Sequence, residues 1–275
     1  MPSLRRGAAD CGQGNGALSL LRLGDLQVII APLPSISSSL LKIGTCGFPL
    51  KRSQYFERFS VVEIQQTFYQ PPARKTVQRW REEAPPGFEF TLKAWQLITH
   101  EPSSPTYRRL KQFISPTQIG SYGSFRPTEE VWMAWIRTEE IARALGARII
   151  LFQAPASFRP TEGNQANLRS FFRRIARRDY LLVWEPRGDW PEQVIEDLCR
   201  ELDLIHGVDP FRARQLAGSI RYFRLHGKGG YRYRYTDDDL AWLKDQIDPG
   251  VVTYLMFNNI PMAQDAERLH HLVFG

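Results

Sequence analysis

The sequence is poor in cysteine and has no long apolar run. Its 275 residues include three cysteines, Cys11, Cys46 and Cys199, whose spacing forms neither a disulfide framework nor a metal-binding motif. So few thiols are typical of a reducing compartment, and we expect a cytoplasmic protein. No apolar stretch reaches the roughly 18 residues of a membrane span. Residues 1–22 also lack a hydrophobic region followed by a small-residue cleavage site, so we expect no membrane partner and no secretory signal.

The glycine-rich motifs that cradle nucleotides are absent as well. Neither GxGxxG nor GxxxxGK[ST] occurs, which counts against the common nucleotide-binding folds, and no cofactor is evident. No short histidine or cysteine spacing indicates a metal, although a divalent metal held by dispersed histidines and carboxylates stays an alternative. The net charge of +7, from 36 basic and 29 acidic residues, favours an anionic partner without identifying it. The oligomeric state is not determined by the sequence.

What the sequence does contain is a regular alternation of apolar strands and amphipathic helices after residue 40. Strands are expected at residues 41–45, 61–67, 88–94, 148–153, 180–184, 204–208, 220–226 and 251–257. Helices are expected at about 73–83, 128–145, 164–178, 237–246 and 262–273. This pattern predicts an α/β fold, a TIM-type (β/α)8 barrel forming a single domain over residues 41–275. An open doubly wound sheet is the alternative, because strand closure cannot be seen in a sequence.

Two helix starts carry capping-box spacing, Asp189 with Glu192 and Thr236 with Asp239. Residues 1–40 differ from the barrel segment, since they are rich in Gly, Ser, Pro and Leu and lack periodicity. A short strand is expected at residues 26–31 and a linker at 35–39. We expect this segment to be a poorly ordered or peripheral N-terminal extension that contributes little to the pocket.

Polar residues stand at or just after the ends of the predicted strands. In a barrel the catalytic residues lie at the carboxyl ends of the strands and on the loops that follow them. These positions predict four catalytic candidates: Glu63, His100, Glu185 and His226. They also predict nine substrate-binding candidates: Gln65, Lys93, Gln153, Arg187, Arg224, Gly227, Lys228, Asn258 and Asn259.

Seven segments, in order, resemble the domain of unknown function 72 family. They begin at Ile43 (IGTCGF), Val62 (VEIQQTFY), Phe90 (FTLK), Thr99 (TH), Trp184 (WEPR), Tyr222 (YFRLHG) and Phe257 (FNN). The resemblance spans about residues 41–275 and implies a TIM barrel, but it implies no particular reaction. The family often has Ser-Gly-Trp in place of Cys46-Gly47-Phe48 and Asn-Ser in place of Gln65-Gln66. A mechanism that needs that serine or asparagine would not carry over.

The main candidates could also have a purely structural role. Glu185 and Arg187 are either an ion pair that shapes the barrel mouth or an acid/base with an anion clamp. Glu63 points into the barrel if its strand is regular, and Lys93 on the next strand is its expected partner, for structure or for catalysis.

The remaining histidines and the cysteine at the first strand end are expected to be structural. His206 lies among apolar residues and is expected to be a core histidine, and His270 and His271 are expected to be structural or solvent-facing. Cys46 shows no local base that would make it a nucleophile.

Glycines 227, 229 and 230 with Lys228 form a loop whose backbone could hold a phosphate, or serve as a flexible connection. The following residues, 231–235, interleave tyrosine with arginine, a pattern that can stack nucleic-acid bases or simply form an amphipathic loop. The first hypothesis is an enzyme for a small phosphorylated or anionic substrate, acting by hydrolysis or acid/base chemistry. The alternative is a nucleic-acid-binding or processing protein, and a third reading is a non-catalytic ligand-binding barrel.

Overall fold

The computed structural model describes residues 20–23, 26–29, 37 and 39–275. The chain divides into two units, Met1–Ser35 and Ile36–Gly275. In the first unit, β1 (Leu20–Leu23) pairs antiparallel with β2 (Leu26–Ile29), and β2 confirms four residues of the strand predicted at 26–31. Residues 30 and 31 and most of the predicted linker lie outside the described residues. The expectation that residues 1–40 are peripheral stays a prediction.

The second unit is a barrel of eight parallel strands that follow one another in chain order. The last strand pairs with the first, and a bridge between Val208 and Phe223 joins β8 to β9. The TIM-barrel prediction is therefore confirmed, and the open-sheet alternative is wrong. The strands are β3 (Leu41–Cys46), β4 (Val61–Ile64), β5 (Glu89–Lys93), β6 (Ile149–Gln153), β7 (Leu181–Glu185), β8 (Ile205–His206), β9 (Arg221–Leu225) and β10 (Thr253–Phe257).

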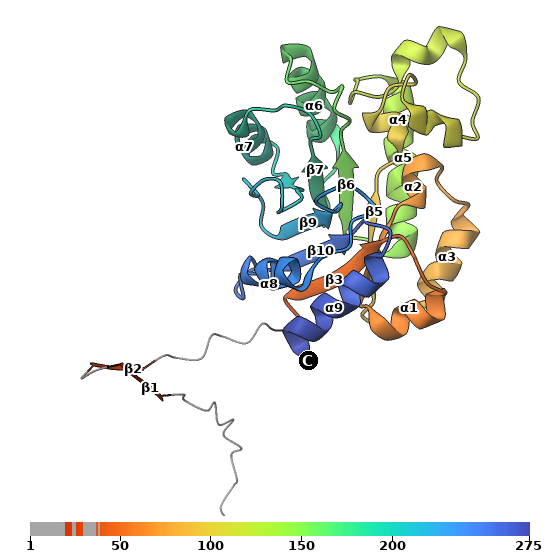
Figure 1. Ribbon diagram of the computed structural model, residues 1–275. Helices are drawn as coiled ribbons and strands as arrows, with labels where there is room; N and C mark the ends of the chain where they lie inside the picture. Colours follow the sequence, from red (N-terminus) through yellow and green to blue (C-terminus); the bar gives the residue numbers. More distant parts are fainter. Residues whose placement is uncertain (1–19, 24–25, 30–36, 38) are drawn as a thin grey trace, which may run out of the picture. The chain divides into compact units, whose positions relative to one another are not determined.

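Helices surround this ring of strands (Figure 1). None of those in the described part of the chain is long and apolar enough to cross a membrane. The α-helices are α1 (Arg52–Arg58), α2 (Gln66–Tyr69), α3 (Arg74–Glu83), α4 (Gln96–Thr99), α5 (Glu129–Leu145), α6 (Glu162–Arg174), α7 (Glu192–Glu201), α8 (Asp237–Asp245) and α9 (Met262–Phe274). Two short 3-10 helices, η1 (Pro105–Arg109) and η2 (Pro116–Ser121), lie between β5 and α5.

The ends of several elements differ from the predictions. The second barrel strand stops at Ile64, because the Thr67 hydroxyl donates to the carbonyls of Ile64 and Lys93, at 2.9 and 2.6 Å, and turns the chain into α2. The capping box at Asp189 is wrong, since α7 begins after Pro191 without a side-chain cap. The capping box of Thr236 and Asp239 is confirmed.

The strands separate two apolar groups of side chains, as their alternating direction requires. The larger group, which includes Leu92, Trp184 and Leu225, packs between strands and helices. The smaller group, which includes Leu151 and Val183, fills the inside of the barrel. Toward the carboxyl ends of the strands, the side chains that point into the barrel become polar. They are Glu63, Lys93, Gln153, Glu185 and Arg224, and each follows by two residues another side chain that points inward. These polar side chains form the candidate site.

Candidate functional site

Arg224 is the centre of the polar cluster inside the barrel, and its side chain is fully buried at 0% exposure. Its Nε and Nη2 donate to the two carboxylate oxygens of Glu63, at 3.1 and 2.9 Å. Its Nη1 donates to Glu185 Oε2 at 2.7 Å. Burial alone would lower the pKa of Arg224, but Glu63 and Glu185 raise it well above its usual range. One permanent cation therefore neutralises carboxylates from two different strands.

The partner expected for Glu63 was Lys93 on the neighbouring strand, and that prediction is wrong. Glu63 is instead held by Arg224 and by the Tyr222 hydroxyl, which donates to Glu63 Oε2 at 2.8 Å. Tyr222 also lies 2.8 Å from the Thr91 hydroxyl, and Gln65 donates to Glu63 from the mouth side. Glu63 is fully buried with every close partner in place, so it serves as a structural anchor of the cluster.

Glu185 is the carboxylate that faces the barrel mouth. Its Oε1 lies 2.7 Å from Arg187 Nε and accepts a hydrogen bond from Gln153 Nε2 at 3.3 Å. Burial would raise the pKa of Glu185, but Arg224 and then Arg187 lower it to about 2. The carboxylate is therefore ionised at any physiological pH. It can stabilise positive charge or orient a ligand, but it cannot supply a proton.

Lys93 is buried, at 6% exposure, and has no carboxylate within ion-pair distance among the described residues. Its Nζ donates to the amide oxygen of Gln153 at 2.5 Å and lies 3.8 Å from the centre of the Phe68 ring. Burial, followed by the positive charge of Arg224, lowers the pKa of Lys93 to about 7. This amine can therefore gain or lose a proton near neutral pH.

His226 contacts two arginines through the same ring nitrogen. Its Nε2 lies 3.3 Å from Arg224 Nη1 and is also in hydrogen-bond contact with Arg187 Nη2. Guanidinium groups only donate, so Nε2 accepts and the ring proton must be on Nδ1, 3.5 Å from Asp209 Oδ2. Burial and Arg224 lower the pKa of His226. In this arrangement the neutral imidazole accepts from both arginines and so links them.

His100 lies beside the cluster rather than in it. Its ring packs edge-on against Phe68 at 4.9 Å, and its Nδ1 is 2.7 Å from the Thr99 hydroxyl. Burial, with Lys93 nearby, lowers its pKa to about 3, so the ring stays neutral. Phe68 thus stands between His100 and Lys93. Nothing in the sequence distinguished this phenylalanine, whose position on α2 depends on the turn at Thr67.

Cys46 has the structural character expected of it, and His206 is buried as expected. The Cys46 thiol is buried 3.6 Å from Arg224 Nη2, and burial, with Glu63, raises its pKa well above the usual value. It is therefore a thiol and not a nucleophilic thiolate. His206 is buried, and its Nδ1 accepts from the backbone N–H of Leu216 at 3.2 Å.

Several donors of the glycine loop after β9 are bonded within the loop and to neighbouring segments. Lys228 forms an ion pair with Asp239 on α8, and the N–H of Gly227 donates to the Tyr235 hydroxyl at 2.8 Å. The N–H of Gly230 donates to the carbonyl of Gly227 at 3.2 Å. These groups are not directed at Arg224 or Arg187. The structure therefore does not unite the loop with the two arginines as the sequence predicted.

The tyrosines of residues 231–235 do not form a continuous stacking surface. Tyr235 is buried, the Tyr233 hydroxyl donates to Asp239 at 2.6 Å, and Tyr231 alone of the three is exposed. Asn259 is also structural, since its side-chain amide donates to Asp265 at 2.7 Å. Asn258 is half-buried, and its backbone N–H donates to Leu225 at 2.8 Å.

Eight of the thirteen predicted site residues thus form one connected network: Glu63, Gln65, Lys93, Gln153, Glu185, Arg187, Arg224 and His226. Tyr222 also belongs to it. Its position two residues before Arg224 is the signal that could have identified it, because the two side chains must point the same way.

The donor set does not fit a divalent metal. In the described part of the chain, no group of three or more His, Cys, Asp or Glu residues is arranged to hold one. A cation between Glu63 and Glu185 would meet the guanidinium of Arg224, which already donates to both carboxylates. A metal ion that displaced the guanidinium from the two carboxylates would leave the charge of Arg224 buried without a partner.

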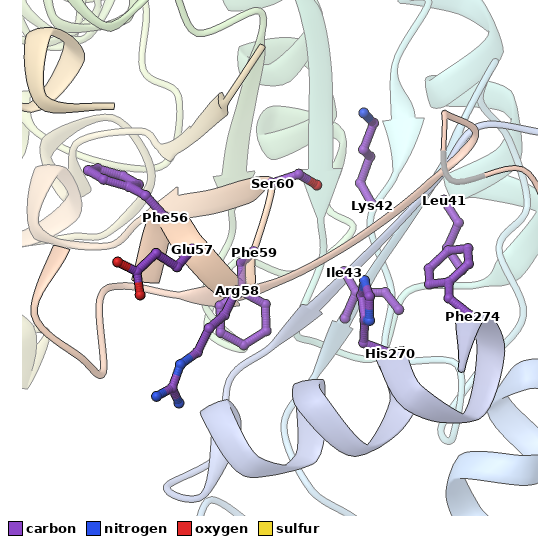
Figure 2. Close-up of a pocket in the computed structure, with 10 residues that line it drawn as sticks. All are labelled: Leu41, Lys42, Ile43, Phe56, Glu57, Arg58, Phe59, Ser60, His270 and Phe274. Carbon is purple, nitrogen blue, oxygen red and sulfur yellow. The ribbon is translucent and has the colours of Figure 1, made fainter. Parts of the chain in front are cut away.

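A cavity of about 360 Å³ adjoins the network, with Glu185, Arg187 and Asp209 in its wall. Another cavity of about 370 Å³ lies near the start of β3, between α1 and the end of α9. Figure 2 shows that the charged side chains of this second cavity, Lys42, Glu57 and Arg58, point away from one another. Of these two cavities, the first is the one that adjoins the buried charges of the network.

Comparison with known proteins agrees with this architecture. A family described as "Protein of unknown function DUF72" matches residues 49–273. The chain belongs to the DUF72 family. The resemblance noted in the sequence is confirmed. No curated protein matches the sequence of this DUF72 chain.

Solved structures include two similar DUF72 proteins. The one from Thermotoga maritima MSB8 is 21% identical, with a TM-score of 0.63 over 86% of this chain and 100% of the other. The one from Enterococcus faecalis V583 is 18% identical, with a TM-score of 0.63 over 85% of this chain and 97% of the other. A D-psicose 3-epimerase is similar at 11% identity, with a TM-score of 0.54 over 84% of this chain and 97% of that one. At these identities the likeness shows the fold alone, a TIM barrel.

Proposed function

We propose that this DUF72 barrel is an enzyme that transfers protons on a small anionic substrate at the carboxyl ends of its strands. The observation that carries the proposal is the environment of Lys93, a buried amine whose hydrogen bond goes to the neutral amide of Gln153. With a pKa of about 7, half of these amines are neutral at neutral pH. An ordinary lysine is neutral in fewer than roughly one molecule in a thousand. A base is most effective when its pKa lies near the working pH.

The other members of the network have supporting roles in this proposal. Glu185 stays ionised and, through Gln153, orients the Lys93 amine. Arg187 is partly exposed at the mouth and binds the substrate's negative charge, while Arg224 and neutral His226 hold Glu185 and Arg187 in position. Proton transfer thus passes to Lys93, which the sequence assigned to substrate binding. Of the groups that the sequence favoured for this role, Glu185 stays ionised and His100 stays neutral, because their pKa values are lowered to about 2 and about 3.

The choice of substrates to test draws on the fold. One structural neighbour is a D-psicose 3-epimerase solved in the presence of D-fructose. Sugars carry a C–H next to a carbonyl, and removing that proton requires a positioned base. We therefore expect an anionic sugar derivative or a related hydroxy-carbonyl compound to be the substrate.

Proton exchange with heavy water tests the proposal even while the product is unidentified. The protein is incubated in D2O with sugar phosphates, sugar acids and 2-oxo acids, and proton NMR follows the C–H signal next to each carbonyl. We expect exchange of at least one compound to be faster with wild type than with Lys93→Met by about a hundredfold or more. Equal exchange by wild type and Lys93→Met would refute the role of Lys93. The exposed Lys51→Met is the matched control and should retain the wild-type rate.

A further inference from the structure

We infer that the cavity beside the barrel mouth binds the oxyanion end of the substrate, a phosphate or carboxylate group, through Arg187, His206, Arg212 and Arg214. The inference rests on the proposed function, because it gives a place to the anionic part of the molecule on which Lys93 would act. It departs from the sequence-based expectation, which placed the anion at the glycine loop after β9. The experiment must therefore decide whether the anion binds in the cavity or at the glycine loop.

The cavity lies between two connections at the carboxyl ends of neighbouring strands. One wall comes from the segment between β7 and α7, and the other from the segment between β8 and β9. Its volume of about 360 Å³ falls in the range of small-molecule sites. Glu185 belongs to its wall and is linked through Gln153 to Lys93. The cavity therefore adjoins the hydrogen-bond chain that leads to the amine.

The two buried carboxylates in the wall of this cavity, Glu185 and Asp209, already accept hydrogen bonds. Glu185 takes hydrogen bonds from Gln153 and Arg224 and pairs with Arg187. Asp209 accepts from the backbone N–H groups of Phe211 and His226, each at 3.1 Å. A cationic ligand or one rich in donors would find few open acceptors there.

Donors, by contrast, remain available. The side chain of Arg212 makes no hydrogen bond with the described residues, and its carboxylate contact is Asp209 at 3.9 Å. Arg214 pairs with Glu192 at 3.0 Å, but both side chains are exposed, and exposed ion pairs contribute little to stability. Arg214 can therefore exchange Glu192 for a ligand at little cost.

His206 supplies the buried donor of the site, with 4% of its surface exposed. Its Nδ1 accepts from the N–H of Leu216, and burial lowers its pKa to about 4, so the neutral ring carries its proton on Nε2. That Nε2–H makes no hydrogen bond with the described residues, although His206 lines the cavity. Guanidinium forks and a neutral N–H donor form the combination that binds an oxyanion.

The glycine loop after β9, the other possible anion site, has fewer free hydrogen-bond donors. Lys228 is already paired with Asp239, and two of the three glycine N–H groups donate within the protein. An anion at the loop would have to break the Lys228 pair and would gain fewer free donors. The cavity is therefore the better anion site of the two.

Calorimetric titration with inorganic phosphate and with acetate tests the location. The variant is Arg212→Ala combined with Arg214→Ala, two exposed positions at which loss of folding is not expected. The matched control is Lys228→Ala combined with Arg234→Ala, two exposed basic residues of the glycine loop and its neighbour. We expect phosphate affinity to fall about tenfold or more in the first variant and to stay unchanged in the control. Proton NMR of the histidine ring C–H signals should show His206 shifting with phosphate while His270 and His271 do not.

Unchanged affinity in the arginine variant, absence of phosphate and acetate binding, or loss of binding in the Lys228 control would each overturn the inference. Preference for phosphate over acetate would support the site and identify a phosphorylated substrate, and the reverse preference would support it with a carboxylate. If wild type catalyses proton exchange but binds neither anion in the cavity, the inference fails while the proposed function stands. If the anions bind but Lys93→Met exchanges protons like wild type, the proposed function fails and the cavity stands as a binding site.

Discussion

Arg224 on β9 reaches across the barrel to Glu63 on β4 and holds both of its carboxylate oxygens, at 2.9 and 3.1 Å. The two strands are not neighbours in the ring, since β3 and β10 lie between them. Both side chains are fully buried, so neither charge can be compensated by solvent. The same guanidinium also holds Glu185, which makes it the link between the closed interior and the mouth.

Removing this guanidinium should destabilise the protein severely. Arg224→Met leaves Glu63 and Glu185 as buried carboxylates without their main partner, a loss worth about 3–5 kcal/mol. Equilibrium unfolding in urea near neutral pH measures the change. The matched control is Arg79→Met, which removes an exposed pair with Glu83 and should cost about 1 kcal/mol or less. A similar small loss in both variants would show that the barrel tolerates the unpaired carboxylates.

The fold was predictable because its signals are local and repeat. Apolar strands followed by helices recur along residues 41–275, and period-two alternation places Glu63, Glu185 and Arg224 on the inner side of their strands. The family resemblance pointed to the same fold. Sequence reasoning therefore located the polar end of the barrel and most members of its network.

The pairing inside the network was not predictable from neighbouring strands. Lys93 stands on the strand next to Glu63, yet Arg224 reaches Glu63 from 161 residues further along the chain. Its guanidinium presents five donors in a rigid planar fork, so it can hold both oxygens of Glu63 while it also donates to Glu185, a geometry that an ammonium group does not supply. The pairing was therefore decided by side-chain geometry and ring closure, which are visible only in three dimensions.

The failed capping box at Asp189 has a similar cause. The Trp190 indole donates to the carbonyl of Phe158 at 2.8 Å and packs 5.0 Å from Trp184, so the chain at this point follows tertiary contacts. Helix α7 then starts beyond Pro191, too late for Asp189 to cap it. The Thr236 box succeeded because no comparable contact displaces it.

The glycines of the loop after β9 should differ in their tolerance to substitution. Both Gly227 and Gly230 have positive φ, at 82° and 105°, so alanine at either position is strained by about 1–2 kcal/mol. At Gly227 a Cβ atom would also lie 2.4 Å from the Gly230 carbonyl oxygen, whereas at Gly230 it would meet nothing within 4 Å. Urea unfolding should show Gly227→Ala to be the less stable variant by about 1–3 kcal/mol. Equal losses would indicate that the loop relaxes freely.

Cys46 and Cys199 should resist thiol reagents in the native protein. Both are buried, and burial raises both thiol pKa values, to about 12 for Cys199. Mass spectrometry of peptides after brief alkylation should find both unmodified until denaturant is added, and a small thiol compound in the same sample reports on the reagent. Native modification of Cys46 at a much higher rate than Cys199 would contradict this and restore Cys46 as a candidate nucleophile.

Replacing Lys93 by methionine should alter how stability depends on pH, with a definite sign. Burial, and then Arg224, lowers the folded-state pKa of Lys93 to about 7 from an ordinary 10.5. Between these values the unfolded chain binds a proton that the folded chain has released, so this group makes wild-type stability rise with pH by up to about 1.4 kcal/mol per unit. Below the folded pKa both states carry the proton, and the cost of burying it is present in full. Methionine has no such dependence.

We therefore expect Lys93→Met to gain most over wild type near about pH 6 and to lose that advantage steadily toward about pH 9. Urea unfolding of both proteins across this interval gives the difference, in which titrations shared by the two proteins cancel. Lys51→Met, at an exposed position, should differ from wild type by an amount independent of pH. A constant difference for Lys93→Met as well would mean that Lys93 keeps an ordinary pKa in the folded protein. It would then be protonated at neutral pH, and its proposed role as the base would lose its physical support.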